Sequence, residues 1–328
     1  MHGDPVGGNQ SGLALVLTLL TISFLVAVTI QLMITTDRQV TVSTAQREQV
    51  RLDGMVLAGL NLARAALAAD QQENAHDSNH DVWATLDPDK LKTLTGDVAL
   101  KVEVNELGGR LQVNALGDGA KEAYREIWLR LLLSGRFAVA GEDEAEDLLD
   151  ALADWIDRDD DERQGGAEEP YYRARTPSYS CRNGPFATVE ELLLVKGMTP
   201  KLLYGDDGHE GLAKYITVMG ENGAVNLNTA PLPVVQALSS EMSSKLAQEL
   251  INFREDPRHV KALATAGWYR EVTGFPPSIE FNNDLLVVEG KYFEVKVNAA
   301  IHQFSRTGTG VLFRNGEQWQ TLLLWKLE

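Results

Sequence analysis

An acidic loop within residues 152–172 carries the side chains with the clearest potential for chemistry. Its sequence is LADWIDRDDDERQGGAEEPYY, in which Asp157, Asp159, Asp161 and Glu168 stand at relative positions 1, 3, 5 and 12. That is the carboxylate spacing of a calcium-binding loop. Hard oxygen ligands and several negative charges also suit Ca²⁺ better than zinc. The sequence therefore predicts a structural calcium site on these four residues.

Two features of this loop leave a second interpretation open. Position 6, where such loops usually have glycine, is occupied by Glu162. The loop could instead be a solvated acidic segment with Arg158, Arg163 and Arg173 as counter-charges. Two carboxylates about 4 Å apart repel by roughly 1 kcal/mol in water and about 4 kcal/mol at an effective dielectric of 20. We therefore expect the metal-free loop either to open or to bind a cation.

Helices are expected on both sides of the acidic loop. The segment EDEAEDLLDALADWI begins with acids, which favour a helix start through the macrodipole. We expect the ion to hold its ADWI end against the following YY pair. Residues 186–265 are also helical in pattern, with Thr188 and Glu191 predicted as a capping box and Asn228 or Thr229 as a later cap.

Strand patterns flank this helical block. Residues 98–104 and 110–116 alternate apolar and polar, and NELGG between them predicts a hairpin. After residue 285 the alternation returns in three segments, LLVVEGKYFEVKVNAAIHQF, TGVLFRN and QWQTLLLWKL. Strands at both ends of a helical block predict an α+β fold. Residues 37–118 would supply a long helix and the first strands, residues 285–328 the strands that complete an antiparallel sheet, and residues 119–284 an inserted helical domain.

The N-terminal region predicts a membrane helix that continues into the soluble part. Residues 13–34 carry no charge and would span roughly 33 Å as a helix, about one bilayer core. They end without an A-x-A-like cleavage site, so residues 13–36 are interpreted as an uncleaved single span. Good helix formers continue to Ala69, followed by a polar loop over 70–90. We expect this outer half to pack one face on a globular domain. An apolar stripe marks that face: Val50, Leu52, Met55, Val56, Leu60, Ala63 and Leu67.

Composition excludes several classes of protein. The 328 residues carry a formal net charge of -17, which argues against nucleic acid as a partner. The one cysteine, Cys181, cannot form an intrachain disulfide and is expected to be a buried or incidental thiol. No common catalytic motif is present, so we expect no enzyme activity. Stretches around Gly197 and Asn228 are similar to helix-hairpin-helix modules, which leaves a membrane-anchored DNA-uptake protein as one alternative.

Taken together, several motifs resemble those of the K-type minor pseudopilins of the bacterial type II secretion system. The resemblance covers nearly the whole chain and rests on SGLALVLTLLTISFLV, ADWIDRDDDERQGGAEEPYY, NGPFATVEELLLVKGMT and VNLNTAP. It implies a prepilin leader, residues 1–12, cut by a prepilin peptidase after Gly12 so that Leu13 becomes the N-terminus. Leu17 then stands where major pseudopilins carry a glutamate, as is usual in K-type members. The leader has no Lys or Arg, whereas prepilin leaders are normally basic.

The resemblance also implies a fold and a function. The fold would be pilin-like, with a long helix on an antiparallel sheet and a large all-helical domain inserted between strands. The protein would cap the pseudopilus and help to initiate its assembly, bound to I- and J-type minor pseudopilins mainly through the 40–69 stripe. The major pseudopilin, the secretin and secreted substrates are further candidate partners. The protein would be anchored in the inner membrane with its soluble part in the periplasm, and calcium would bind in the inserted domain. Besides the DNA-uptake protein, the second alternative function is that of a tip-like minor pilin of a type IV pilus.

Overall fold

The computed structural model describes residues 10–86, 88–117, 119–316 and 320–328. The helices are α1 (Gln10–Glu73), α2 (Pro88–Thr95), α3 (Glu122–Leu132), α4 (Glu142–Ile156), α5 (Glu169–Arg173), α6 (Pro200–Tyr204), α7 (Leu232–Ala237) and α8 (Ser244–Glu255). The strands are β1 (Ala99–Glu106), β2 (Leu111–Gln112), β3 (Ile216–Thr217), β4 (Val225–Asn226), β5 (Leu286–Val287), β6 (Tyr292–Ile301), β7 (Phe304–Phe313) and β8 (Thr321–Leu327). Short 3-10 helices connect several of them, and Val189–Leu194 is one of these.

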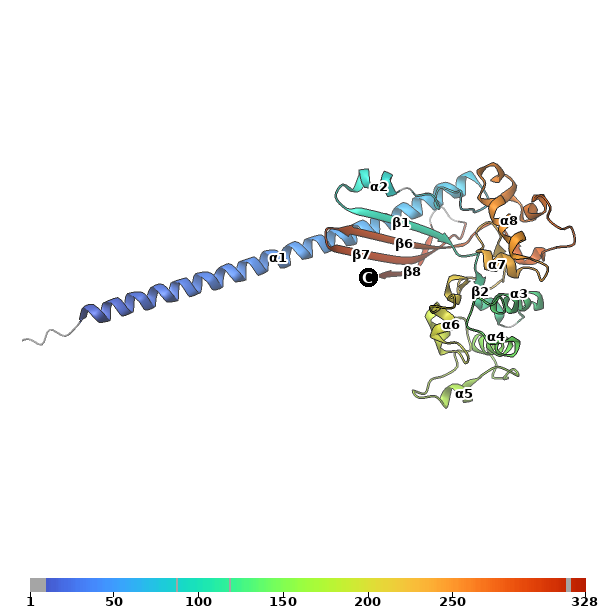
Figure 1. Cartoon of the computed structure of the whole chain (residues 1–328), viewed down its shortest axis with the longest axis horizontal. Helices are drawn as coiled ribbons and strands as arrows, with labels where there is room; N and C mark the ends of the chain where they lie inside the picture. The colour runs from blue at the N-terminus through green and yellow to red at the C-terminus, as the bar shows by residue number, and fades with distance from the viewer. Residues whose placement is uncertain (1–9, 87, 118, 317–319) are drawn as a thin grey trace, which may run out of the picture.

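One continuous helix, α1, forms the N-terminal part of the described chain. Its 64 residues correspond to about 96 Å, and its first half projects alone from the rest of the protein (Figure 1). The most apolar 18-residue window has a mean hydropathy of 2.7, and none of that window is buried. By length and composition, this helix could serve as a single membrane anchor. The prediction of one helix through residues 13–69 is confirmed, whereas leader residues 1–9 lie outside the described part of the chain.

The outer half of α1 packs on an antiparallel sheet in the order β1-β6-β7-β8 (Figure 1). In register, Val102 of β1 faces Val297 of β6, which faces Gly308 of β7. Alternate residues of β1 and β6 point toward α1 and are buried with its apolar stripe in one core. Helix and sheet approach closely at Gly59, where an added Cβ would lie 2.5 Å from Val297 Cγ1. The predicted sheet, with strands from both ends of the chain, is confirmed.

Two sequence-based expectations about this part of the fold are wrong. Most of the stripe on α1 is covered by the protein's own sheet, with Leu52, Val56 and Leu67 fully buried, so it is not available to partners. Residues 98–104 and 110–116 do not form a hairpin, because β1 pairs with β6 and β2 pairs in parallel with β3. The reason lies at the end of β1. The Glu106 carboxylate accepts hydrogen bonds from the Gly108 and Gly109 amides and fixes a turn that sends the chain into the inserted domain.

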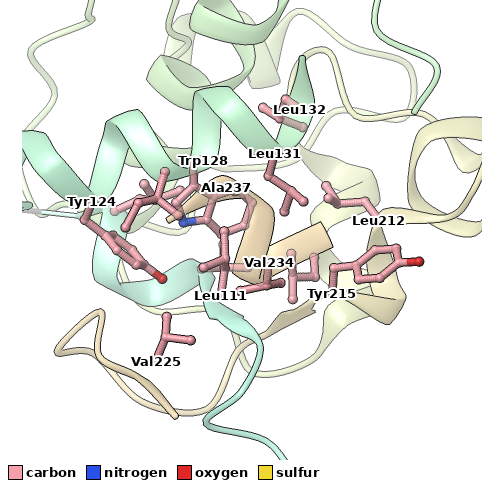
Figure 2. Close-up of a cluster of buried hydrophobic side chains, with 14 of the residues drawn as sticks. Leu111, Tyr124, Trp128, Leu131, Leu132, Leu212, Tyr215, Val225, Val234 and Ala237 are labelled. Atoms are coloured by element: carbon pink, nitrogen blue, oxygen red, sulfur yellow. The ribbon is translucent and has the colours of Figure 1, made fainter. Parts of the chain in front are cut away.

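The inserted domain has its own hydrophobic core, shown in Figure 2. Leu111 of β2 and Val225 of β4 lie beside Tyr124 and Trp128 of α3 and Val234 of α7. The domain is mostly helical, as predicted, but it also contains β3 and β4, whose parallel partners β2 and β5 border it. The inserted domain is therefore mostly helical and not all-helical as the resemblance implies.

The predicted helix caps in this domain differ from the observed ones. Thr188 makes no side-chain cap bond to the 3-10 helix Val189–Leu194. Glu191 accepts a bond from the Ala187 amide, one residue before the Thr188 amide that a capping box would use. Helix α7 begins at Leu232, beyond Asn228 and Thr229. Those two side chains are used elsewhere: Asn228 donates to the Leu263 carbonyl, and Thr229 donates to Glu106.

The stretch after α1 is not the solvated polar loop that its composition suggests. Asp77 and Asp81 are buried, as is Asp70 at the end of α1. Arg314, which directly follows β7, pairs with Asp70 at 3.1 Å and with Asp77 at 2.9 Å. A buried counter-charge from the far end of the chain therefore draws this loop into the interior.

Candidate metal centre

Helix α4 positions two buried carboxylates at its C-terminal end. Asp154 lies in its last turn and is fully buried, and Asp157 is its C-cap residue and is 2% exposed. Acids in the first turn of a helix interact favourably with the macrodipole, as Glu142, Asp143 and Glu144 do here. Acids at the C-terminal end face the negative pole of the dipole, and α4 has no basic residue in its last turn. These two carboxylates therefore need a cation from elsewhere.

The loop that follows α4 adds further carboxylates. Oxygen atoms of Asp157, Asp159 and Glu168 all lie within 4.8 Å of one another. Glu168 is the N-cap residue of α5 and is 1% exposed, and both of its carboxylate oxygens are without a hydrogen-bond partner among the described residues. Burial raises the pKa of the Glu168 carboxyl to about 7, and the negative charge of Asp154 adds to the rise. An orphaned buried carboxylate beside two others is the arrangement that a cation would satisfy.

Asp161 lies outside this group in the structure. Its backbone amide donates to Oδ1 of Asp159 at 3.0 Å, which shapes the turn, while Asp161 itself is exposed. Three of the four carboxylates predicted as ligands are therefore brought together.

Arg163 supplies a positive charge within the loop itself. Its Nη1 donates to Asp154 Oδ1 at 2.5 Å and also to Asp157 Oδ2. The backbone amide of Arg163 donates to the other oxygen of Asp154 at 3.2 Å. Of the three arginines considered as counter-charges, Arg163 has this role, whereas Arg173 pairs with Glu169 at the surface.

Gly165 and Gly166 let the loop pass directly over α4. An added Cβ on Gly166 would lie 1.8 Å from Asp154 Oδ2, so this position has no room for a side chain. The Lys196 ammonium group donates to the carbonyl oxygens of Gly165 at 3.1 Å and Gly166 at 2.8 Å. The Ala167 amide donates to Asp154 Oδ2 at 2.9 Å. The second half of the loop is thus held by contacts that do not involve the group of three carboxylates.

Aromatic residues pack against one another at both ends of the loop. The rings of Trp155 and Tyr172 meet edge to face, with centroids 4.9 Å apart, and Trp155 stacks on Phe186 at 6.1 Å. Tyr172 is fully buried. The ADWI and YY segments are therefore in direct contact. This end of the inserted domain, with α4 and α5, lies away from the sheet (Figure 1).

The donor set at this site fits a hard divalent cation. The group of three consists only of carboxylates, with no histidine or cysteine among its members. Carboxylate oxygens in a flexible loop are the ligands that Ca²⁺ prefers, and the orphaned oxygens of Glu168 are available to it. Asp157, Asp159 and Glu168 are thus the residues that could hold the ion, with buried Asp154 next to them.

Sequence reasoning missed two residues of the site. Asp154 precedes Asp157 by three residues in a predicted helix, a spacing that places both side chains on one face and could have identified it. Lys196 lies about 30 positions from the glycines that it contacts, and no sequence signal connects them. A second buried acidic group, Asp70, Asp77 and Asp81, was also missed.

The structure also places the residues of the predicted processing site. Leu13 and Leu17 lie near the start of α1 and are 66% and 55% exposed. Gly12 precedes them in the first turns of the same helix. Cleavage at this position stays a prediction.

Comparisons with known proteins point to one family. Two family models match residues 109–220 and 225–286, and both are described as type II secretion system (T2SS), protein K. Type II secretion system protein K of Pseudomonas aeruginosa is 26% identical over 261 residues, covering 75% of this chain and 73% of its own length. The putative type II secretion system protein K of Escherichia coli K12 is 21% identical over 326 residues, covering 95% and 96%.

A solved structure has the same fold. It is a chain in the crystal structure of the GspK-GspI-GspJ complex from the type 2 secretion system of enterotoxigenic Escherichia coli. The TM-score is 0.62 at 17% identity, with 87% of this chain and 99% of that chain covered.

Proposed function

The chain belongs to the family of type II secretion system protein K, whose members are minor pseudopilins, and we propose that this chain caps the tip of the secretion pseudopilus. At the tip it would help to initiate assembly for protein export across the outer membrane. The observation that carries this proposal is the inserted domain. It lies beside the sheet at the end of α1 opposite the apolar segment, where a further subunit would otherwise stack (Figure 1).

The start of α1 supports the same role. Leu17 replaces the glutamate that major pseudopilins use to pair with the N-terminal amine of the subunit ahead, and a subunit at the tip has none ahead. We propose that a prepilin peptidase cuts after Gly12, and that α1 then anchors the protein in the inner membrane with the soluble part in the periplasm. In this role the protein is a structural component with no reaction of its own to catalyse.

We propose I- and J-type minor pseudopilins as the partners, because the similar solved chain comes from a complex with GspI and GspJ. Most of the stripe on α1 is buried against the sheet, so partners would use the opposite face of that helix. Leu57 is exposed there (50%), and so is Val50, which the sequence pattern assigns to the stripe but which is 72% exposed in the structure.

Co-purification tests the tip role. The full chain in detergent, incubated with tagged I- and J-type pseudopilins, should form a discrete complex and no long homopolymer. Val50→Glu and Leu57→Glu should weaken that complex, whereas Glu103→Gln on the sheet should not. Homopolymers, or no binding to either partner, would contradict the role. Salt-dependent binding to DNA would favour the DNA-uptake alternative.

We further propose that Asp157, Asp159 and Glu168 hold a structural calcium ion. The ion would supply positive charge at the C-terminal end of α4 and fix the ADWI segment against Tyr172. Binding only to the folded state, it would stabilise the protein by about 2.7 kcal/mol at a hundredfold excess over its Kd. Thermal unfolding of the full chain in EDTA and in millimolar calcium tests this. The midpoint should rise with calcium in the wild type and much less in Glu168→Gln, and an unchanged wild-type midpoint without calorimetric heat would refute the site.

A further inference from the structure

We infer that the Arg163 guanidinium competes with calcium for Asp157. It pairs with Asp154 and Asp157 when calcium is absent, and it must leave Asp157 when calcium binds. The inference rests on the proposed calcium site and concerns its regulation. The Asp157 carboxylate would bind either the guanidinium or the calcium ion.

The shared residue is Asp157. One of its oxygens accepts a hydrogen bond from Arg163 Nη1, and the residue also belongs to the group whose oxygens lie within 4.8 Å of one another. A calcium ion binds carboxylate oxygens at about 2.3–2.6 Å, which would place it within a few ångströms of the guanidinium. Two positive charges so close in a buried setting repel strongly. Both cannot bind Asp157 at full strength at the same time.

Arg163 can leave without unfolding the loop. Its side chain is 34% exposed, whereas those of Asp154 and Asp157 are 0% and 1% exposed, so the guanidinium lies on the solvent side of the pair. Asp154 would keep two backbone donors, the amides of Arg163 and Ala167. Lys196 holds the carbonyls of Gly165 and Gly166 independently. The loop backbone is thus held without the guanidinium, whereas Asp154 Oδ1, which accepts from Arg163 Nη1, would then depend on the ion for positive charge.

The consequence is a loop that stays ordered with or without the metal. From the sequence, we expect a metal-free loop either to open or to bind a cation. In the structure the Arg163 guanidinium provides the positive charge, so repulsion among the carboxylates is reduced without a bound ion. The cost is weaker calcium binding, since the ion must displace an existing charge-assisted ion pair. Arg163 therefore sets the calcium concentration at which the site fills.

Calcium titration of the full chain in detergent tests this inference. Isothermal calorimetry is run on the wild type, Arg163→Gln, Arg163→Lys and the control Arg158→Gln. The control removes one positive charge from the same loop at an exposed position. We expect Arg163→Gln to bind calcium about tenfold more tightly, or more, and Arg158→Gln to change affinity by less than about threefold. Arg163→Lys keeps the charge but presents a single ammonium group, so it should fall between wild type and Arg163→Gln.

Unfolding midpoints supply a second readout. In EDTA, Arg163→Gln should unfold at a lower temperature than the wild type, and calcium should raise its midpoint by more. If Arg163→Gln does not fold in EDTA, the unfolding midpoints of Arg163→Lys in EDTA and in calcium are compared with those of the wild type instead. Calcium binding by the variant alone would also support the inference.

The two proposals fail differently. Equal or weaker calcium affinity in Arg163→Gln, with the wild type binding, overturns the inference and leaves the calcium site standing. No calcium binding by the wild type or by any Arg163 variant overturns both.

Discussion

The Thr229 hydroxyl donates a 2.5 Å hydrogen bond to Oε2 of Glu106, although the two residues lie 123 positions apart. Glu106 is the last residue of β1, and Thr229 precedes α7 in the inserted domain. The same carboxylate accepts bonds from the Gly108 amide at 2.5 Å and the Gly109 amide at 3.0 Å. One buried side chain therefore both shapes the exit from the sheet and attaches the inserted domain to it.

This arrangement predicts a pH dependence of stability that Glu106→Gln should remove. Burial raises the pKa of the Glu106 carboxyl from 4.5 to about 7. The folded state thus holds this proton more tightly than the unfolded chain. The stability that it contributes is complete below about pH 4.5 and is lost as the pH rises through 7. Relative to Glu106→Gln, the wild type should lose roughly 2 kcal/mol of unfolding free energy between pH 5 and pH 8.

Urea unfolding at several pH values measures this difference. Glu103→Gln, on the same strand in a surface pair with Lys101, is the control and should run parallel to the wild type. If the wild-type and Glu106→Gln curves also run parallel, Glu106 does not change its ionisation in this range and the interpretation fails.

A second prediction concerns the buried arginine. Arg314 compensates Asp70 and Asp77 with all three side chains at most 5% exposed. Arg314→Gln would leave buried carboxylates without a cation and should cost about 3–5 kcal/mol, or roughly 10 °C in unfolding midpoint. Arg306→Gln makes the same change on β7 at a partly exposed pair with Asp53 and should cost less than about 1 kcal/mol. Similar midpoints for the two variants would show that Arg314 is not needed in the core.

Local patterns in the sequence identify most of the elements but not their long-range pairings. The apolar run and the helix formers predict α1, and alternation predicts that β6, β7 and β8 exist. The first predicted segment begins seven residues before β6, and the second begins five residues after the start of β7. The hairpin prediction fails because NELGG looks like a turn between adjacent strands. What decides its conformation is the Glu106 carboxylate together with a partner strand nearly 200 residues away.

For the candidate site too, the sequence identifies residues that lie close along the chain but not contacts between distant segments. The spacing of carboxylates along one loop identifies Asp157, Asp159 and Glu168, because the loop itself brings them together. Spacing alone includes Asp161, whose side chain the turn at Asp159 leaves outside the group. The contacts of Lys196 and Arg314 depend on packing between distant segments, for which a single sequence carries no signal.

A third prediction is proteolytic processing between Gly12 and Leu13. A polar leader meets an uncharged helix at this glycine, so the peptidase must accommodate a small residue before the bond. Gly12→Ala should be processed almost normally, whereas Gly12→Leu should leave the precursor uncut. Intact mass and N-terminal sequencing of the membrane fraction distinguish the two forms. A mature chain that begins at Met1, or after Ala27, would rule this site out.

The last prediction separates the shape of the acidic loop from its charge. Gly166→Ala adds one methyl group and changes no charge, yet its Cβ would lie 1.8 Å from Asp154 Oδ2. The loop must then move off α4, which breaks the Ala167-to-Asp154 bond and the Lys196 contacts with the glycine carbonyls. We expect a loss of about 1–3 kcal/mol in EDTA, together with weaker calcium binding, because Glu168 follows two residues later. Gly141→Ala at the start of α4 is the matched control, since an added Cβ there meets nothing within 4 Å, and it should change the midpoint little. If Gly166→Ala instead behaved like Gly141→Ala, the loop would not need its close approach to α4, and the site would depend on carboxylate charge alone.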